Sequence, residues 1–214
     1  MLPQSRDEGR RSGRMPFTSA TLGVILLYIW VLDQRLPRSA AAAVIVVVLV
    51  LGLWHAARTG EWGFARAAFV PSLRAVALFT VPAVIAILAA GAWRGTLHDR
   101  RDFLGSLAPL VVWGGAQQWI LQTLVLREAQ RAASRRPGIV LAAALFAAVH
   151  LPNPFLTAVT FAGGLAWCAV YSRHPNILPL ALSHGLGTLA ILYAFDPELT
   201  GRLRIGYSYL QLGG

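Results

Sequence analysis

The sequence predicts an all-α integral membrane protein, built as a bundle of seven or eight transmembrane helices. Of its 214 residues, 56% are hydrophobic and only 13% are charged. The apolar residues come in blocks too long for the core helices of a soluble domain, since crossing a bilayer takes about 20 of them. All 19 basic residues are Arg, and most lie between the blocks, where Arg orients a membrane chain.

Seven apolar blocks define the candidate spans. They cover residues 17–32, 39–57, 74–93, 103–126, 138–151, 154–173 and 176–195. The fifth block is short and ends at Leu151-Pro152-Asn153-Pro154, whose prolines cannot donate backbone hydrogen bonds, so we expect a tight bend between antiparallel helices there. Residues 61–70 mix aromatic residues with Arg, which predicts a short interfacial helix that anchors the chain.

The rest of the chain predicts a single domain with polar ends. We expect a polar tail at 1–16, one transmembrane domain at 17–195 and a C-terminal tail at 196–214, with either Met1 or Met15 as the true start. The single cysteine, Cys168, cannot form an intrachain disulfide and is expected to be a packing residue.

We expect the protein to lie in the bacterial cytoplasmic membrane. The Arg distribution predicts that its N-terminus is on the cytoplasmic side. With that orientation, 12 Arg lie on the cytoplasmic side: Arg6, Arg10, Arg11, Arg14, Arg58, Arg66, Arg74, Arg127, Arg131, Arg135, Arg136 and Arg173. The opposite side holds 7: Arg35, Arg38, Arg94, Arg100, Arg101, Arg202 and Arg204. The net charge of +10 is therefore attributed to contact with anionic lipid and not to a nucleic-acid partner.

Three apolar blocks carry polar side chains at helical spacing. These side chains are Gln117, Gln118 and Gln122 in the fourth block, His150 four positions after Phe146 in the fifth, and His184 four positions before Thr188 in the seventh. Polar groups in hydrocarbon are costly, so we expect an intramembrane site in a polar cavity between these three spans. The three Gln also suit interhelical hydrogen bonds. His55, His98 and His174 lie at block ends and are expected to be interfacial.

These elements resemble the signature of the CPBP family of intramembrane proteases, also called the type II CAAX prenyl endopeptidase or ABI family. Members carry Glu-Glu-x-x-x-Arg, then Phe-x-x-x-His, then His-x-x-x-Asn or Asp; the resemblance covers roughly residues 103–195. It implies an endopeptidase that cleaves peptide bonds of membrane-associated proteins, with the first Glu and a His activating water and the second His and the Asn stabilising the oxyanion. Phe146 and Asn153 become candidate substrate-binding residues. The family's metalloprotease label implies zinc, for which His150 and His184 would be the ligands.

The chain departs from that signature where the chemistry needs a carboxylate. Gln117 and Gln118 replace the two Glu, Gln122 replaces the Arg, and Thr188 replaces the Asn or Asp. A Gln amide has no usable basicity near neutral pH. The nearest acid, Glu128, lies ten positions after Gln118, about 15 Å along a helix.

Two functions therefore remain open at the level of sequence. The chain is a family endopeptidase or a descendant of one, or it is a proteolytically silent relative that binds a membrane peptide or partner in the former active-site cavity. A small transporter or proton path using the two His ranks below both, because the first three spans carry few polar side chains. In either leading case we expect His150 and His184 to line the cavity, with Gln118 in the place of the catalytic Glu.

Overall fold

A computed structural model describes residues 14–37, 39–98 and 102–213 of the chain. Within those ranges every regular element is a helix, and β-type pairing is limited to one isolated bridge between Phe64 and Asn176. The protein is thus an all-α membrane protein, as predicted. Most of the predicted tail at 1–16, together with Arg38, Arg100 and Arg101, lies outside the described residues.

Each of the seven apolar blocks forms a helix. These are α1 (Pro16–Leu27) with η1 (Tyr28–Leu32), α2 (Ala40–Thr59), α3 (Phe69–Arg94), α4 (Phe103–Trp119) with η3 (Ile120–Leu126) and α5 (Arg127–Ala133), α6 (Arg135–Ala148), α7 (Pro154–Tyr171) and α8 (Ile177–Ala194). Two short helices follow, α9 (Pro197–Thr200) and α10 (Gly206–Leu210). Four helical stretches are long and apolar enough to cross a membrane: Ala40–Thr59, Arg66–Arg94, Pro154–Tyr171 and Ile177–Ala194.

The helix ends follow local sequence chemistry. Asn153 and Asn176 begin α7 and α8, and their side-chain oxygens accept hydrogen bonds from the backbone N–H groups of Leu156 and Leu178. Gly60 ends α2 with a φ of 72°, a conformation that glycine adopts without steric cost.

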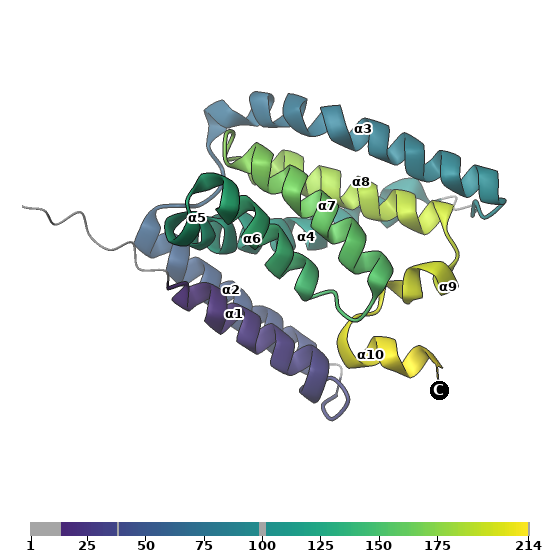
Figure 1. The fold of residues 1–214 in the computed structure, drawn as a ribbon, viewed down its shortest axis with the longest axis horizontal. Helices are drawn as coiled ribbons and strands as arrows, with labels where there is room; N and C mark the ends of the chain where they lie inside the picture. Colours follow the sequence, from purple (N-terminus) through teal and green to yellow (C-terminus); the bar gives the residue numbers. More distant parts are fainter. Residues whose placement is uncertain (1–13, 38, 99–101, 214) are drawn as a thin grey trace, which may run out of the picture.

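The helices pack as hairpins around α8 and the π-helical segment η3 (Figure 1). The α1–α2 pair lies on one side of the bundle and the long α3 on the other, packed against α8. The side chains of Leu124, Leu126 and Leu180, from η3 and α8, are fully buried in the interior of the bundle. The outer helices expose large apolar side chains, such as Leu78 and Trp93 on α3, as expected of surfaces that face lipid.

The prediction of an interfacial helix at 61–70 is wrong. Residues 61–65 form no helix and are docked against the start of α8, Arg66–Ala68 form a 3-10 turn, and Phe69 and Val70 already belong to the long helix α3. The backbone N–H of Ile177 donates to the Gly63 carbonyl at 2.9 Å, and the N–H of Ala65 donates to Pro175 at 3.2 Å. Gly63 has a φ of 81°, and a Cβ there would collide with Ile177, so this docking requires glycine.

His55 is buried although it lies at the end of an apolar block. His55 is 1% exposed, with its ring edge-on to Phe17 and its Nε2 3.4 Å from Arg131 Nη1. His55 is therefore covered by α1 and α5 and is not part of the protein surface. His98 is partly exposed and lies 3.3 Å from Asp196. Cys168 is fully buried and free, as predicted for a packing residue.

Candidate functional site

A chain of amide and imidazole groups links α4, η3 and α8. Gln122 Nε2 donates to Gln118 Oε1 at 2.9 Å, and Gln118 Nε2 lies 3.3 Å from His184 Nδ1. An amide NH2 group can only donate, so Gln118 Nε2 donates to His184 Nδ1. The His184 proton therefore resides on Nε2. Gln118 and Gln122 are fully buried. Their mutual bond lies within the continuous α4–η3 helix, whereas the contact from Gln118 to His184 joins α4 to α8.

Aromatic rings and a close helix approach fix His184. Its ring stacks on Trp167 with centroids 4.8 Å apart and an interplanar angle of 20°, and Phe146 approaches edge-on at 6.2 Å. Gly114 lies opposite, where a Cβ would come within 3.1 Å of the His184 Cβ. Trp167 in turn donates to Ser183 Oγ at 2.9 Å. His184 is thus held in one orientation from both sides.

His150 lies in the turn after α6 and has the opposite tautomer. Its Nδ1 lies 2.8 Å from the Phe146 carbonyl oxygen, which can only accept, so Nδ1 carries the proton. The lone pair is then on Nε2. The Phe146 ring lies edge-on to both histidines, 5.0 Å from His150 and 6.2 Å from His184, and so joins the fifth block to the seventh. The Gln118–His184 contact joins the fourth block to the seventh.

The cavity of this region has a volume of about 530 Å³. Its walls come from α1, α2, α4 with η3, α6 and residues 203–208, and they are mostly apolar. Among the predicted site residues, Gln117, Phe146 and His150 line it. Gln118, Gln122, His184 and Thr188 do not.

This cavity differs from the predicted one in two respects. The cavity lies between the first, second, fourth and fifth blocks, whereas the prediction placed it between the fourth, fifth and seventh and expected it to be polar. Gln117, and not Gln118, faces it with His150. The reason is the helical rotation of about 100° per residue, which turns Gln118 towards α8 when Gln117 faces α1 and α2.

Sequence reasoning missed polar groups that line this cavity outside the three elements. Asp33 follows η1 and is the one carboxylate residue in the described lining; its Oδ1 accepts from the Tyr28 hydroxyl at 3.2 Å. Arg204 comes from the C-terminal segment. Both lie outside residues 103–195, so the motif spacing carries no signal for them.

Asn153 and Thr188 do not behave as the resemblance implies. Asn153 is fully buried, and its Nδ2 donates to the carbonyl oxygens of Thr200 at 2.9 Å and Arg204 at 3.0 Å. With its oxygen capping α7, the amide is committed to the fold and is not available to a substrate. Thr188 is half-buried and makes no side-chain hydrogen bond to the part of the chain that the structure describes.

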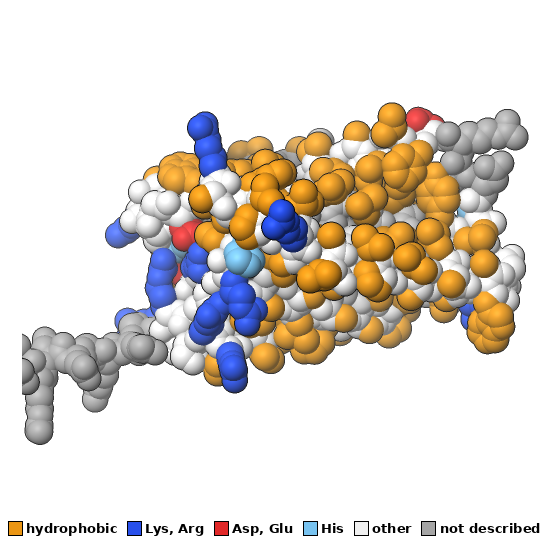
Figure 2. Space-filling model, turned by 90° about the horizontal axis from the view of Figure 1, so that it is seen from above, with side chains coloured by type: hydrophobic (Ala, Val, Ile, Leu, Met, Phe, Trp, Pro, Cys, Tyr) orange, Lys and Arg blue, Asp and Glu red, His pale blue; other side chains and the backbone are white. Residues whose placement is uncertain are grey.

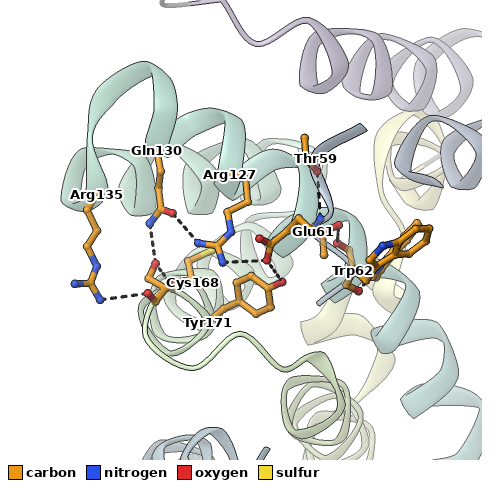
Figure 3. Close-up of polar contacts among 11 residues, drawn as sticks. Thr59, Glu61, Trp62, Arg127, Gln130, Arg135, Cys168 and Tyr171 are labelled. Carbon is orange, nitrogen blue, oxygen red and sulfur yellow. Dashed lines mark hydrogen bonds and ion pairs between the residues drawn. The ribbon is translucent and has the colours of Figure 1, made fainter. Parts of the chain in front are cut away.

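Glu128, the acid nearest in sequence to Gln118, and Glu61 serve the fold elsewhere. Glu128 accepts from the backbone N–H groups of Phe17 and Thr18 at 3.3 and 2.8 Å, so it caps the start of α1. Glu61 pairs with Arg127 at 2.9 Å and accepts from the Tyr171 hydroxyl at 2.7 Å (Figure 3). Neither lines the cavity.

The donor set does not fit a catalytic zinc ion. The described residues contain no group of three or more His, Cys, Asp and Glu side chains that could hold a metal. A catalytic zinc site takes three protein ligands. No step of the chemistry is therefore derived through a metal.

Comparison with known proteins gives one family match. The family model described as type II CAAX prenyl endopeptidase Rce1-like matches residues 99–190. This range contains all three polar elements and the turn that holds His150. No curated protein and no solved structure matches the chain.

Proposed function

We propose that this membrane protein, whose residues 99–190 match the family model of Rce1-like type II CAAX prenyl endopeptidases, binds an apolar membrane peptide in its cavity without hydrolysing it. The observation that carries the proposal is the amide at the place of each family Glu. Gln117 faces the cavity beside His150, and Gln118 is closed into bonds with Gln122 and His184. Neither amide can accept the proton of an attacking water.

The cavity suits a peptide with a large apolar part. Its volume of about 530 Å³ is enclosed mainly by Leu, Ile, Val and aromatic side chains. A few polar groups in an apolar pocket orient a ligand, and here the Gln117 amide and the His150 Nε2 are available to peptide N–H and C=O groups. The family's description as a CAAX prenyl endopeptidase supports a ligand of the same kind. A lipid-modified or transmembrane peptide is therefore the proposed ligand.

A cavity-blocking variant tests the binding. Leu145→Trp fills the cavity from α6, whereas Val140→Trp places the same ring on the exposed face of the same helix. Photo-crosslinking of a prenylated CAAX peptide to the full chain in vesicles should fall by tenfold or more, about 1.4 kcal/mol, in the first variant only. Equal crosslinking in the wild type and both variants would contradict the proposal.

One observation favours residual hydrolysis as a second candidate. His150 lines the cavity and presents a lone pair at Nε2, which is the state of a general base. In this route His150 takes the proton of the water that adds to the peptide carbonyl and returns it to the leaving amine. His184 does not line the cavity and has no part in this step. Peptide-bond cleavage by the wild type that is lost in His150→Ala would select this candidate over pure binding.

We further propose that the N-terminus lies on the cytoplasmic side. Figure 2 shows most Arg side chains gathered at one end of the molecule. That end carries Arg14, the end of α2, the start of α3 and the α5–α6 turn. An excess of Arg at one end supports a cytoplasmic position for that end.

A further inference from the structure

A second pocket, with a volume of about 1050 Å³, opens at the Arg-rich end of the molecule. Four Arg side chains line it: Arg14, Arg127, Arg131 and Arg135. Its one lining carboxylate, Glu128, is 5% exposed and is already occupied by the backbone N–H groups that begin α1. The pocket therefore has a strong positive charge that its own walls do not neutralise.

Three of the four Arg have no anionic partner in the described structure. Arg127 pairs with Glu61 and lies over the Tyr171 ring at 5.0 Å (Figure 3). By contrast, Arg14, Arg131 and Arg135 form no ion pair with a carboxylate among residues 14–37, 39–98 and 102–213. Arg131 approaches only the His55 ring, and Arg135 donates to the Ser172 carbonyl oxygen at 3.4 Å. Their remaining N–H donors are free for a ligand.

The walls that carry these Arg are rigidly placed. Ser134 joins α5 to α6 with a φ of 67°, and Gly138 lies so close to α5 that a Cβ would come within 2.7 Å of the Gln130 Cα. Gln130 also donates to Ser172 Oγ at 2.8 Å, which holds the end of α7 against α5. The Arg131 and Arg135 backbones are thus fixed on facing sides of a tight helical hairpin.

The depth of the pocket points to the lipid headgroup layer. Its lining residues precede α1, follow η3, begin α6 and follow α7, so they lie where apolar helices end. The same helices α1 and α6 run from this pocket to the apolar cavity, which they line further along with Leu22, Ile25, Leu145 and Val149. A ligand with a charged head and apolar chains fits this gradient better than a free ion does.

We propose that this pocket, lined by Arg14, Arg127, Arg131 and Arg135, is a binding site for the phosphate group of an anionic phospholipid. Arg guanidinium groups bind phosphate oxygens in pairs of parallel hydrogen bonds, and basic pockets between transmembrane helices bind anionic headgroups. The acyl chains lie against the apolar surfaces of α1 and α6. This site is separate from the peptide cavity and does not rest on the proposed function.

Lipid retention by the full chain tests the site. Phosphatidylglycerol and phosphatidylcholine with identical acyl chains are offered to the protein in micelles, and bound lipid is counted by native mass spectrometry. We expect the wild type to retain phosphatidylglycerol selectively, and Arg131→Gln/Arg135→Gln to lose roughly 30-fold in that affinity. The matched control, Arg58→Gln/Arg66→Gln, removes two charges at the same end outside the pocket and should bind as the wild type does.

Three results would overturn the proposal. These are equal retention of the two lipids, an equal loss in the pocket and control variants, and protection against thermal unfolding by millimolar inorganic phosphate that matches the protection by phosphatidylglycerol. The last result would identify a free-anion site. If Arg131→Gln/Arg135→Gln does not fold, Arg14→Gln/Arg135→Gln removes the same charge without disturbing the contact to His55, and the same outcomes apply to it.

Discussion

At the scale of single residues, Gln118 is the side chain on which the polar cluster depends. It accepts from Gln122 and donates to His184, so it connects both partners. The Gln122 Oε1 has no hydrogen-bond partner among the described residues, and losing the Gln118 contact would leave a second polar group of the same side chain unpaired. Buried polar groups without partners are costly in a membrane interior.

Gln118→Leu should therefore lower the free energy of unfolding by about 1–2 kcal/mol, as expected for loss of two buried hydrogen bonds in a membrane protein. Gln117→Leu is the matched control, because Gln117 faces the cavity and its side chain makes no hydrogen bond to the described residues. Its effect should stay within about 0.5 kcal/mol. Reversible unfolding in mixed micelles measures both, and equal destabilisation would contradict the assigned roles.

The residues of this cluster could be predicted from the sequence, but their division between cavity and cluster could not. Spacing places Gln118 and Gln122 on one helix face and shows that Gln117 points elsewhere. Which face meets α8 and which meets the cavity depends on the rotation of the helix in the bundle. Local sequence does not set that rotation. For the same reason the sequence did not show that Asp33 and Arg204 line the cavity.

At the scale of helices, close approach between α4 and α8 is set by glycine. A Cβ at Gly185 would come within 2.7 Å of the Val111 side chain and 3.0 Å of its backbone nitrogen. A Cβ at Gly187, two positions further along α8, would meet no heavy atom of the described residues within 4 Å. The two glycines therefore differ in packing although they share a helix.

Gly185→Ala should destabilise the protein by about 1–3 kcal/mol through overpacking. Gly187→Ala should be neutral or should stabilise by up to about 1 kcal/mol, since Ala is the better helix former. Thermal unfolding in the same detergent compares them. A greater loss in Gly187→Ala than in Gly185→Ala would show that the helices do not pack in this way.

The C-terminal segment is the element whose structure the sequence least indicates. The sequence predicts a tail at 196–214, yet residues 203–208 line the cavity and Gly206 N–H donates to the Leu151 carbonyl at 2.8 Å. Two more hydrogen bonds tether this segment, both donated by the Asn153 side chain to the carbonyl oxygens of Thr200 and Arg204. An Asn in a Pro-Asn-Pro turn signals a helix cap, but nothing in the sequence signals long-range tethers.

Asn153→Asp should separate these two roles, because a carboxylate still caps α7 but cannot donate to Thr200 and Arg204. We expect faster amide hydrogen exchange in residues 196–213 with unchanged protection at the start of α7. Asn153→Ala should weaken both regions. Unchanged exchange in the C-terminal segment of Asn153→Asp would mean that the tethers contribute nothing.

At the scale of the whole molecule, the seven apolar blocks and the bend between the fifth and sixth of them were predictable, because long apolar runs and a proline-rich turn determine them. The docked segment at 61–65 was not, because its partners lie about 110 positions away in the sequence. The orientation of this bundle remains a proposal with a direct test.

Orientation can be read from the labelling of single introduced cysteines, because the native Cys168 is fully buried. Ser134→Cys, in the α5–α6 turn, should react with a membrane-impermeant maleimide only after intact cells are opened. Gln34→Cys, at the opposite end of the bundle, should react in intact cells. The reverse pattern would place the N-terminus outside.

Binding without hydrolysis is tested by measuring cleavage of a peptide that is known to be bound. The wild type, Gln117→Glu and Gln118→Glu are placed in vesicles with a crosslinkable prenylated CAAX peptide, and intact and cleaved peptide are quantified together. We expect binding without cleavage in the wild type and in Gln118→Glu, and cleavage only in Gln117→Glu, where a carboxylate faces the cavity beside His150. Cleavage by the wild type, abolished by His150→Ala, would contradict binding without hydrolysis.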